Sequence, residues 1–263
     1  MLPARIATAA ALIAALLATL FLLPRGAFGV VVALLVGGAA FEWARLCRIA
    51  GALAWAYAAL AAVLYAVPAF AGAATPVMAL GAAFWLAVAP LWLVRGMHAK
   101  QARLLGAAGL AVVVPAGVAM IALTPERLLL SFGLIWIADT FAYFAGRRFG
   151  KHKLAPGISP SKTWEGAAGG LLGTLAYAII CAGVLPGLKS LSGSAWAAYL
   201  AAALGLCVAS IVGDLFESAA KRQAGVKDSG AILPGHGGLL DRIDSATCTL
   251  PFAALLWPLI GAP

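Results

Sequence analysis

The stretch KRQAGVKDSGAILPGHGGLLDRIDS, residues 221–245, lies between two long apolar segments and decides how the chain is interpreted. It holds four cations, three carboxylates and one histidine, in a chain of 263 residues of which only 10% are charged and 64% are hydrophobic. The flanking apolar segments have about the twenty residues that an α-helix needs to cross a bilayer. The sequence therefore predicts an all-α polytopic integral membrane protein, in which this stretch connects two membrane helices.

Nine candidate spans follow from the lengths of the apolar runs and from their charged, Pro or Gly interruptions. They cover residues 4–23, 27–44, 51–72, 76–94, 104–123, 127–145, 165–185, 195–217 and 246–261. Lys and Arg accumulate in cytoplasmic loops, so the basic residues test this segmentation. With a cytoplasmic N-terminus, all 18 basic residues except Arg25, Arg127 and Lys189 fall on the cytoplasmic side. We therefore expect the C-terminus outside and the first span retained rather than cleaved as a signal peptide.

The acidic residues divide the chain into two unequal parts. Of nine Asp and Glu residues, only Glu42 and Glu126 lie in the first half. We therefore expect about five N-terminal transmembrane helices in residues 1–125, and a catalytic region of about four helices in residues 126–263 with two cytoplasmic active-site loops. The net charge of +9 on the cytoplasmic face suits lipid headgroups or phosphates. It does not indicate nucleic-acid binding, because no basic-aromatic module accompanies it.

Two aspartates lie inside the predicted spans. Asp139 and Asp214 precede the basic cytoplasmic ends of their helices by eight and seven residues, which places each carboxylate on the order of 10 Å below that end. At this depth a carboxylate needs a cation, a polar partner or a wet cavity, so a structural salt bridge and an active site are both possible. Helical spacing adds polar neighbours to the same faces: Tyr143 and Arg147 to Asp139, and Glu217, Ser218 and Lys221 to Asp214.

The first polar loop, GRRFGKHKLAPGISPSKTWEG, covers residues 146–166. It presents hydroxyls and an ammonium group just before a predicted helix, where free backbone N–H groups favour anions. The glycine that a P-loop requires before the lysine is missing, so we expect phosphate binding without a P-loop fold. Glu165 serves either in a helix-start interaction or in holding an amine. The candidate ligands here are Ser159, Ser161, Lys162, Thr163 and Glu165.

The second polar loop contains PGHGG, residues 234–238, whose glycines let the backbone approach a ligand closely. The next residues place Asp241 and Asp244 three positions apart around Arg242, at the start of the last helix. Together with Asp214, these carboxylates form an oxygen-ligand set suited to Mg²⁺. His236 is either a hydrogen-bonding loop residue or an acid or ligand.

Both loops carry a family resemblance. The sequence SAAKRQAGVKDSGAILPGHGGLLDRID, residues 218–244, resembles the signature of phosphatidate cytidylyltransferases, also called CDP-diacylglycerol synthases. The sequence DTFAYFAGRRFGKHKLAPGISPSKTWEG, residues 139–166, is similar to the second patterned region of that family. The first half resembles the family only in hydropathy and weakly in FEWARL, residues 41–46. The resemblance implies transfer from CTP to phosphatidate, giving CDP-diacylglycerol and pyrophosphate in phospholipid biosynthesis.

The resemblance also implies a cytoplasm-facing cavity, a homodimer and a dependence on Mg²⁺, with or without a second, monovalent cation such as K⁺. Asp214 and Asp241 would be the metal-binding carboxylates. Other active-site positions that match the motif are Ser159, Lys162, Thr163, Lys221, Arg222, Lys227, Asp228, His236 and Asp244. Of these we assign Ser159, Thr163 and His236 to substrate binding and the others to catalysis.

The chemistry of this reaction fits the loops. A phosphate monoester is already an anionic nucleophile, so in-line attack on the α-phosphorus of CTP needs charge neutralisation and alignment more than a general base. We expect the five cations Lys162, Lys221, Arg222, Lys227 and Arg242 to neutralise the two substrates. Further candidate substrate contacts are Asp139, Ser161, Glu165, Ser218, Gly237 and Gly238.

Two other classes of function remain open on sequence grounds. A related enzyme acting on another lipid phosphate, such as an isoprenoid-ether phosphatidate cytidylyltransferase or a polyprenol kinase, would share these polar faces. A cation-coupled transporter would also bury Asp139 and Asp214, but it would not need phosphate-binding loops on one side of the membrane. The Ala- and Leu-rich composition favours a bacterial inner membrane.

Overall fold

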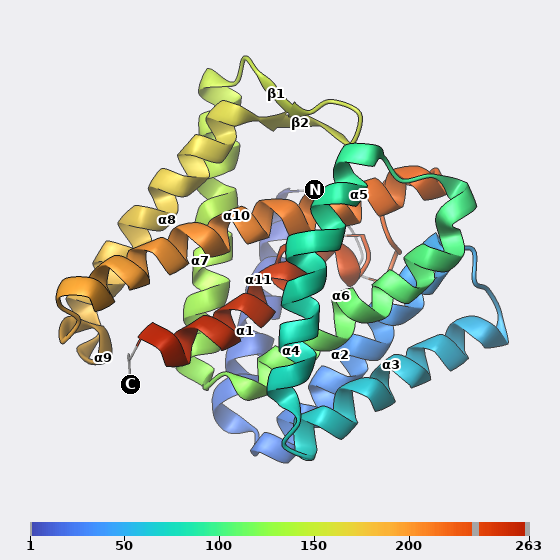
Figure 1. Ribbon diagram of the computed structural model, residues 1–263, viewed down its shortest axis with the longest axis horizontal. Coiled ribbons are helices and arrows are strands. Elements are labelled where there is room, and N and C mark those ends of the chain that lie inside the picture. The colour runs from blue at the N-terminus through green and yellow to red at the C-terminus, as the bar shows by residue number, and fades with distance from the viewer. Residues whose placement is uncertain (1, 233–236, 261–263) are drawn as a thin grey trace.

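The computed structural model describes residues 2–232 and 237–260, which form a bundle of helices with one short β-hairpin at its edge (Figure 1). In chain order the elements are α1 (Leu2–Leu22), α2 (Arg25–Leu46), α3 (Ala52–Phe70), α4 (Ala74–Ala83), the π-helical turn η1 (Phe84–Val88), α5 (Ala89–Arg95), the 3₁₀ turn η2 (Ala99–Gln101), α6 (Ala102–Ala122), α7 (Pro125–Phe149), β1 (Lys153–Ala155), β2 (Ser159–Thr163), α8 (Trp164–Val184), α9 (Pro186–Lys189), α10 (Gly193–Ala224) and α11 (Leu240–Ile260).

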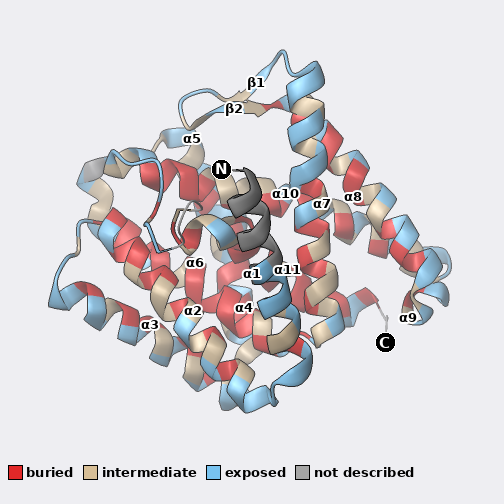
Figure 2. Cartoon of the chain, turned by 180° about the vertical axis from the view of Figure 1, so that it is seen from behind, coloured by how far each residue is buried: buried red, intermediate tan, exposed pale blue. Residues whose placement is uncertain are grey.

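Within the described residues, eight helices are long and apolar enough to cross a membrane, counting the continuous run Ala74–Arg95 as one. The prediction of an all-α polytopic membrane protein is confirmed. The remaining expected span, residues 4–23, corresponds to α1, in which the apolar segment is Ile13–Leu22. Figure 2 shows the buried residues gathered where α2, α4, α6 and α11 meet, with exposed faces on the outer helices. An outer surface that is apolar and exposed suits contact with lipid.

Small residues bring the helices close together, as expected for membrane helices. A side chain on Gly169 would place its Cβ 2.3 Å from the Cβ of Ala145, so α8 approaches α7 at that point because it carries a glycine. Gly213 has the same role between α10 and α11, where a Cβ would lie 2.8 Å from the carbonyl oxygen of Asp244. The glycines at 166, 169, 170 and 173 all lie against α7 in this way, so they are packing residues.

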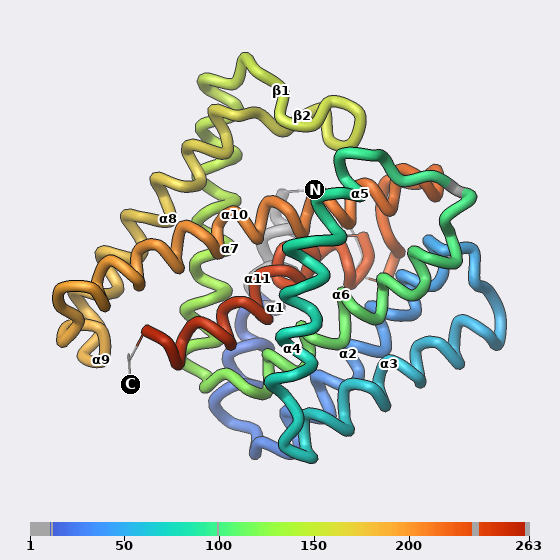
Figure 3. The backbone as a smooth tube through the Cα atoms, in the orientation of Figure 1, coloured from blue at the N-terminus to red at the C-terminus, as the bar shows by residue number. Residues whose placement is uncertain are grey.

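The segment between α7 and α8 is a β-hairpin, where the sequence predicted only a loop. Strands β1 and β2 are antiparallel, with Lys153 opposite Thr163 and Ala155 opposite Ser159. The hairpin lies at the upper edge in Figure 1, near the end of α5, whereas α9 lies at the lower left, at the other end of α8. The backbone in Figure 3 descends from the hairpin through α8 to α9 and returns along α10. The end of α10 therefore lies near the hairpin.

Helices α10 and α11 extend furthest beyond the apolar segments that predicted them. The last turns of α10 continue to Ala224, past residue 217, and α11 begins at Leu240 rather than at residue 246. Apolar run length cannot locate such ends, since the added turns are polar. Asp241 lies in the first turn of α11, where the helix dipole favours a carboxylate. The expected position of the DRID sequence at the start of the last helix is confirmed.

Candidate active site

A cavity of about 440 Å³ opens between α7, β2, the start of α8 and the middle of α10. The polar face predicted on α7 lines it with Asp139, Tyr143 and Arg147, and α10 contributes Asp214. From the first polar loop come Ser161, Lys162 and Thr163. The fold thus brings the two predicted polar faces and the SKT sequence to one cavity, although they are far apart along the chain.

Lys162 of β2 makes an ion pair with Asp214 at the cavity. The Oδ1 atom of Asp214 also accepts a hydrogen bond from the Ser218 hydroxyl, 3.2 Å away, one helical turn along α10. The side chains of Lys162 and Asp214 remain 23% and 28% exposed. This ion pair is therefore partly exposed to the cavity, and a ligand there can reach both side chains.

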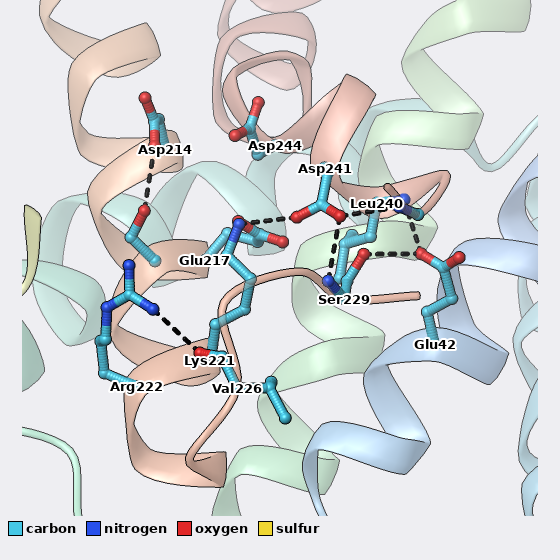
Figure 4. Close-up of polar contacts among 12 residues, drawn as sticks. Glu42, Asp214, Glu217, Lys221, Arg222, Val226, Ser229, Leu240, Asp241 and Asp244 are labelled. Atoms are coloured by element: carbon cyan, nitrogen blue, oxygen red, sulfur yellow. Dashed lines mark hydrogen bonds and ion pairs between the residues drawn. The ribbon is translucent and has the colours of Figure 1, made fainter. Parts of the chain in front are cut away.

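Lys221 forms a second ion-pair cluster that is closed to solvent (Figure 4). Its Nζ lies 2.5 Å from Oε2 of Glu217 and 2.7 Å from Oδ1 of Asp241. The exposed fractions are 10% for Lys221, 3% for Glu217 and 5% for Asp241. Within the described part of the chain, Oε1 of Glu217 is buried without a hydrogen-bond partner. One ammonium group therefore faces two carboxylates.

The backbone of the second polar loop holds the other oxygen of Asp241. Its Oδ2 accepts the N–H of Ser229 at 2.9 Å and the N–H of Gly238 at 2.8 Å. Gly237, just before, adopts a φ of 83°, a region that favours glycine, and a Cβ there would lie 2.7 Å from Asp241 Oδ2. The glycine backbone was expected to approach the nucleotide; in the structure it approaches the Asp241 carboxylate.

Glu42 is a site residue that the sequence analysis missed. It lies on α2 in the first half of the chain, is only 1% exposed, and contacts the second polar loop through Ser229, Leu239 and Leu240. Figure 4 shows it beside Asp241 across that loop. Two signals were available: a carboxylate within an apolar span is costly without partners, and Glu42 belongs to the FEWARL sequence.

Several predicted site residues shape the hairpin and its connection to α10. Thr163 caps α8, its hydroxyl accepting the N–H of Gly166 at 3.1 Å. Glu165 accepts hydrogen bonds from the backbone N–H of His152 and lies 2.6 Å from Nδ1 of its ring, so it joins the start of α8 to the residue before β1, which is neither of the two roles predicted for it. Arg222 donates to the carbonyl oxygens of Ile158, at 3.3 Å, and Val226, at 2.9 Å.

The remaining predicted site residues lie near the hairpin, the end of α10 and the start of α11. Asp244 accepts the N–H of Ser245 at 2.7 Å, and Figure 4 shows it across from Asp214 on the neighbouring helix. Ser159 is half-buried, whereas Lys227, Asp228 and Arg242 are exposed. His236 lies outside the described residues.

The donors at this site suit a hard divalent cation, since Asp139, Asp214 and Asp244 offer carboxylate oxygens. Among the described residues, however, no group of three His, Cys, Asp or Glu side chains lies close enough to hold a metal alone. Each carboxylate of the predicted metal pair is instead neutralised by a lysine, Asp214 by Lys162 and Asp241 by Lys221. A Mg²⁺ ion here would need substrate phosphates and water as further ligands, as is usual for this ion.

Fold and site together define a polytopic membrane protein with a polar, phosphate-suited cavity near one end of its helices. The chain belongs to the cytidylyltransferase family, whose sequence pattern matches residues 3–260. It is 42% identical over 272 residues to the phosphatidate cytidylyltransferase of Pseudomonas aeruginosa, covering 98% of this chain and 97% of that protein. It is also 47% identical over 129 residues to the phosphatidate cytidylyltransferase of Haemophilus influenzae and 41% identical over 125 residues to that of Thermotoga maritima, each covering 48% of this chain. These matches cover 43% and 46% of those two proteins.

Proposed function

We propose that this chain is a nucleotidyltransferase that converts CTP and phosphatidate into CDP-diacylglycerol and pyrophosphate, for phospholipid biosynthesis. The observation that carries the proposal is that the first signature stretch lines one cavity together with Asp214 of α10, the helix that leads into the second stretch, and that Lys162 pairs with Asp214 there. Membership of the cytidylyltransferase family over nearly the whole chain supports it.

The reaction forms one bond and breaks one. A non-bridging oxygen of the lipid phosphate attacks the α-phosphorus of CTP, and the bond from that phosphorus to the oxygen bridging to the β-phosphorus breaks. Pyrophosphate leaves with that oxygen. The protein has to hold two anions in line and neutralise them, because the nucleophile is already ionised near neutral pH.

Lys162 is the cation best placed for this work. It lines the cavity with Arg147, and its ion pair with Asp214 is partly solvated. An incoming phosphate offers Lys162 a stronger anionic partner than a single carboxylate. Binding of substrate would then free Asp214 to act as a ligand for Mg²⁺, together with substrate phosphates. When bound, Mg²⁺ would supply charge neutralisation at the phosphates.

A lipid substrate constrains where this cavity lies in the membrane. Asp139 and Asp214 lie within membrane-spanning helices, so a headgroup at the membrane surface can reach them laterally while CTP enters from water. We propose that the hairpin and the second polar loop face the cytoplasm of a bacterial inner membrane, with a cytoplasmic N-terminus and α1 as a ninth span. Homodimer formation is part of the same proposal, and light scattering of the detergent-solubilised protein tests it.

Cysteine labelling tests the orientation. The four native cysteines are buried, and burial raises the pKa of the Cys47 thiol to about 12, which keeps it protonated and unreactive. A membrane-impermeant maleimide should therefore report on introduced cysteines. Gly157→Cys in the hairpin turn should be labelled only in inside-out vesicles, and Ser190→Cys beside α9 only in right-side-out vesicles. The reverse pattern would overturn the orientation.

The activity test uses purified full-length protein in mixed micelles with CTP labelled at the α-phosphate. We expect organic-soluble label that depends on phosphatidate and Mg²⁺, with one pyrophosphate released per lipid product. Asp214→Asn should remove most of this activity, whereas Glu126→Gln at an exposed position should keep it. Folded protein that labels no lipid under these conditions would overturn the proposal. Label only on an isoprenoid-ether acceptor, or transfer of the γ-phosphate to a polyprenol, would identify one of the related enzymes instead.

A further inference from the structure

Among the residues that the structure describes, the hydrogen-bond partners of Glu42 lie in the second polar loop and at the first residue of α11, 187 to 198 residues later in the chain. Its Oε2 accepts the hydroxyl of Ser229 and the N–H of Leu240, both at 2.8 Å, and its Oε1 accepts the N–H of Leu239 at 3.0 Å. All three donors are uncharged. A buried carboxylate with this many donors is fixed in place, and it fixes the donors in turn.

Ser229 joins Glu42 to Asp241. Its hydroxyl donates to Glu42, while its backbone N–H donates to Oδ2 of Asp241. The same Oδ2 accepts the N–H of Gly238, the residue before the two N–H groups that Glu42 holds. Two carboxylates from different helices therefore hold both ends of the loop, near Ser229 and near Gly238 (Figure 4).

The loop packs against Glu42 too closely for other residue types. A Cβ on Gly230 would lie 2.3 Å from Glu42 Oε1, and a Cβ on Gly238 would lie 2.4 Å from Glu42 Oε2 and 2.2 Å from the Ser229 hydroxyl. Real Cβ contacts are not this short, so both positions require glycine as long as Glu42 occupies this place. The glycine-rich composition of the loop is explained in part by Glu42.

The same end of α2 also holds the end of α10. Gln223 donates to the carbonyl oxygen of Leu46 at 2.9 Å, and the ring of Trp43 stacks on Phe216 with 6.1 Å between centroids. Trp43 is fully buried and its Nε1 donates to Leu105 at 2.7 Å, so this support is rigid. The α2 end thus contacts the helix that carries Asp214 as well as the loop that leads to Asp241.

From these contacts we infer that Glu42 is a positioning residue for the reaction: through Ser229 and the 238–240 backbone, it fixes the second polar loop and the Asp241 carboxylate, one of the two carboxylates expected to hold Mg²⁺ on the CTP phosphates. The inference rests on the proposed function. It assigns to the first half of the chain a part in building the active site, through Asp241 and without contact between Glu42 and substrate.

A carboxylate is required here because three donors share two oxygens. Glutamine has one acceptor oxygen and an amide that donates, so Glu42→Gln leaves at least one donor of Ser229, Leu239 or Leu240 unpaired. An unpaired buried donor costs roughly 1–3 kcal/mol, equivalent to about a 5- to 150-fold change in an equilibrium. Part of that free-energy cost destabilises the conformation that the loop has when substrate is bound.

Steady-state kinetics of Glu42→Gln test this, with Glu126→Gln as the matched control. We expect the KM for CTP to rise by about 10-fold and kcat to fall by a similar factor, with the KM for phosphatidate unchanged within about 2-fold. A purely structural role would lower the fraction of folded enzyme and the midpoint of thermal unfolding but leave both KM values unchanged. That pattern in folded protein would overturn the inference, as would equal KM values for the two variants.

Ser229→Ala provides a test if Glu42→Gln folds poorly. It removes the hydroxyl contact to Glu42 but keeps the N–H that donates to Asp241, so a smaller increase in the KM for CTP, about 3-fold, is expected. The double variant should be less impaired than the product of the two single effects, because both act through one contact. Independent effects would contradict the coupling.

A readout besides activity is tryptic cleavage after the exposed Lys227, followed by mass spectrometry of the full-length protein. Cleavage should be faster in Glu42→Gln than in Glu126→Gln, since the loop is released near Ser229. Equal cleavage rates in the two variants would contradict the inference that Glu42 holds the loop. An inactive wild-type enzyme would instead overturn the proposed function, and would leave the cleavage result to decide whether Glu42 holds the loop.

Discussion

Two lysine–carboxylate clusters lie near each other along α10, and they differ in their access to solvent. Lys162 and Asp214 face a cavity of about 440 Å³ and are each about a quarter exposed. Lys221 lies between Glu217 and Asp241, and all three are at most 10% exposed. Asp214 and Asp241 are equivalent in the sequence pattern, as the predicted metal pair, but they lie in different surroundings.

This difference separates two tasks. In the open pair, the carboxylate and the ammonium group keep part of their water, so they can exchange partners with a substrate at a smaller cost than a closed pair can. In the closed cluster, the charges have lost their water and depend on one another, so removing one member leaves the others uncompensated. We therefore expect Lys162 to act on the substrate, and Lys221 to hold Asp241 and α11 in place.

The largest expected effect is at the closed cluster. Lys221→Met should destabilise the protein by about 3–5 kcal/mol and abolish activity, because it leaves Glu217 and Asp241 buried without a cation. Thermal unfolding in detergent measures this, with Lys227→Met at an exposed position as the control for stability. The double variant Glu217→Leu/Lys221→Met should recover part of the lost stability. A single variant as stable as the control would show that the cluster is open to water.

The next effect is at the open pair. Lys162→Met should lower kcat/KM by about 100-fold, since a charge-assisted contact to phosphate is lost, while stability should fall less than in Lys221→Met because this pair is more exposed. Lys153→Met is the matched control, because Lys153 is an exposed lysine of the same hairpin. Large destabilisation with unchanged turnover would reverse the roles that we assign to the two clusters.

A smaller effect is expected at the contact that braces the hairpin. Glu165→Ala removes the interactions with the backbone and ring of His152, so β2 and Lys162 lose part of their support. Activity should fall about 3- to 10-fold, and tryptic cleavage after Lys151 should become faster. Full activity with a loosened hairpin would mean that Lys162 is positioned by Asp214 alone.

The smallest effect concerns the second contact of Asp214. Ser218→Ala removes a 3.2 Å hydrogen bond to Oδ1 of Asp214, and a single such bond contributes about 0.5–1.5 kcal/mol. Activity should fall less than about 5-fold with stability almost unchanged. A loss as large as that of Lys162→Met would indicate that the hydroxyl itself contacts substrate.

The sequence by itself determined the class of fold and much of the site. Apolar run length gave the membrane helices, since the bilayer fixes how long they must be. Helical spacing gave the two polar faces, and Asp139, Tyr143, Arg147 and Asp214 do line one cavity. Both kinds of inference depend on neighbours within a few residues, which the sequence contains directly.

Only the tertiary structure decided how distant residues share their charges. The pairing of Lys162 with Asp214 crosses 52 residues, and that of Ser229 with Glu42 crosses 187. No local pattern encodes such contacts, because they depend on how α2, α10 and α11 pack. The β-hairpin was missed for a related reason: the residues beside its short strands, His152 and Ile158, are held by Glu165 and Arg222, which lie outside the hairpin. Burial then determines which ion pair is exposed to solvent and which is not. Burial itself is a result of how the helices pack together.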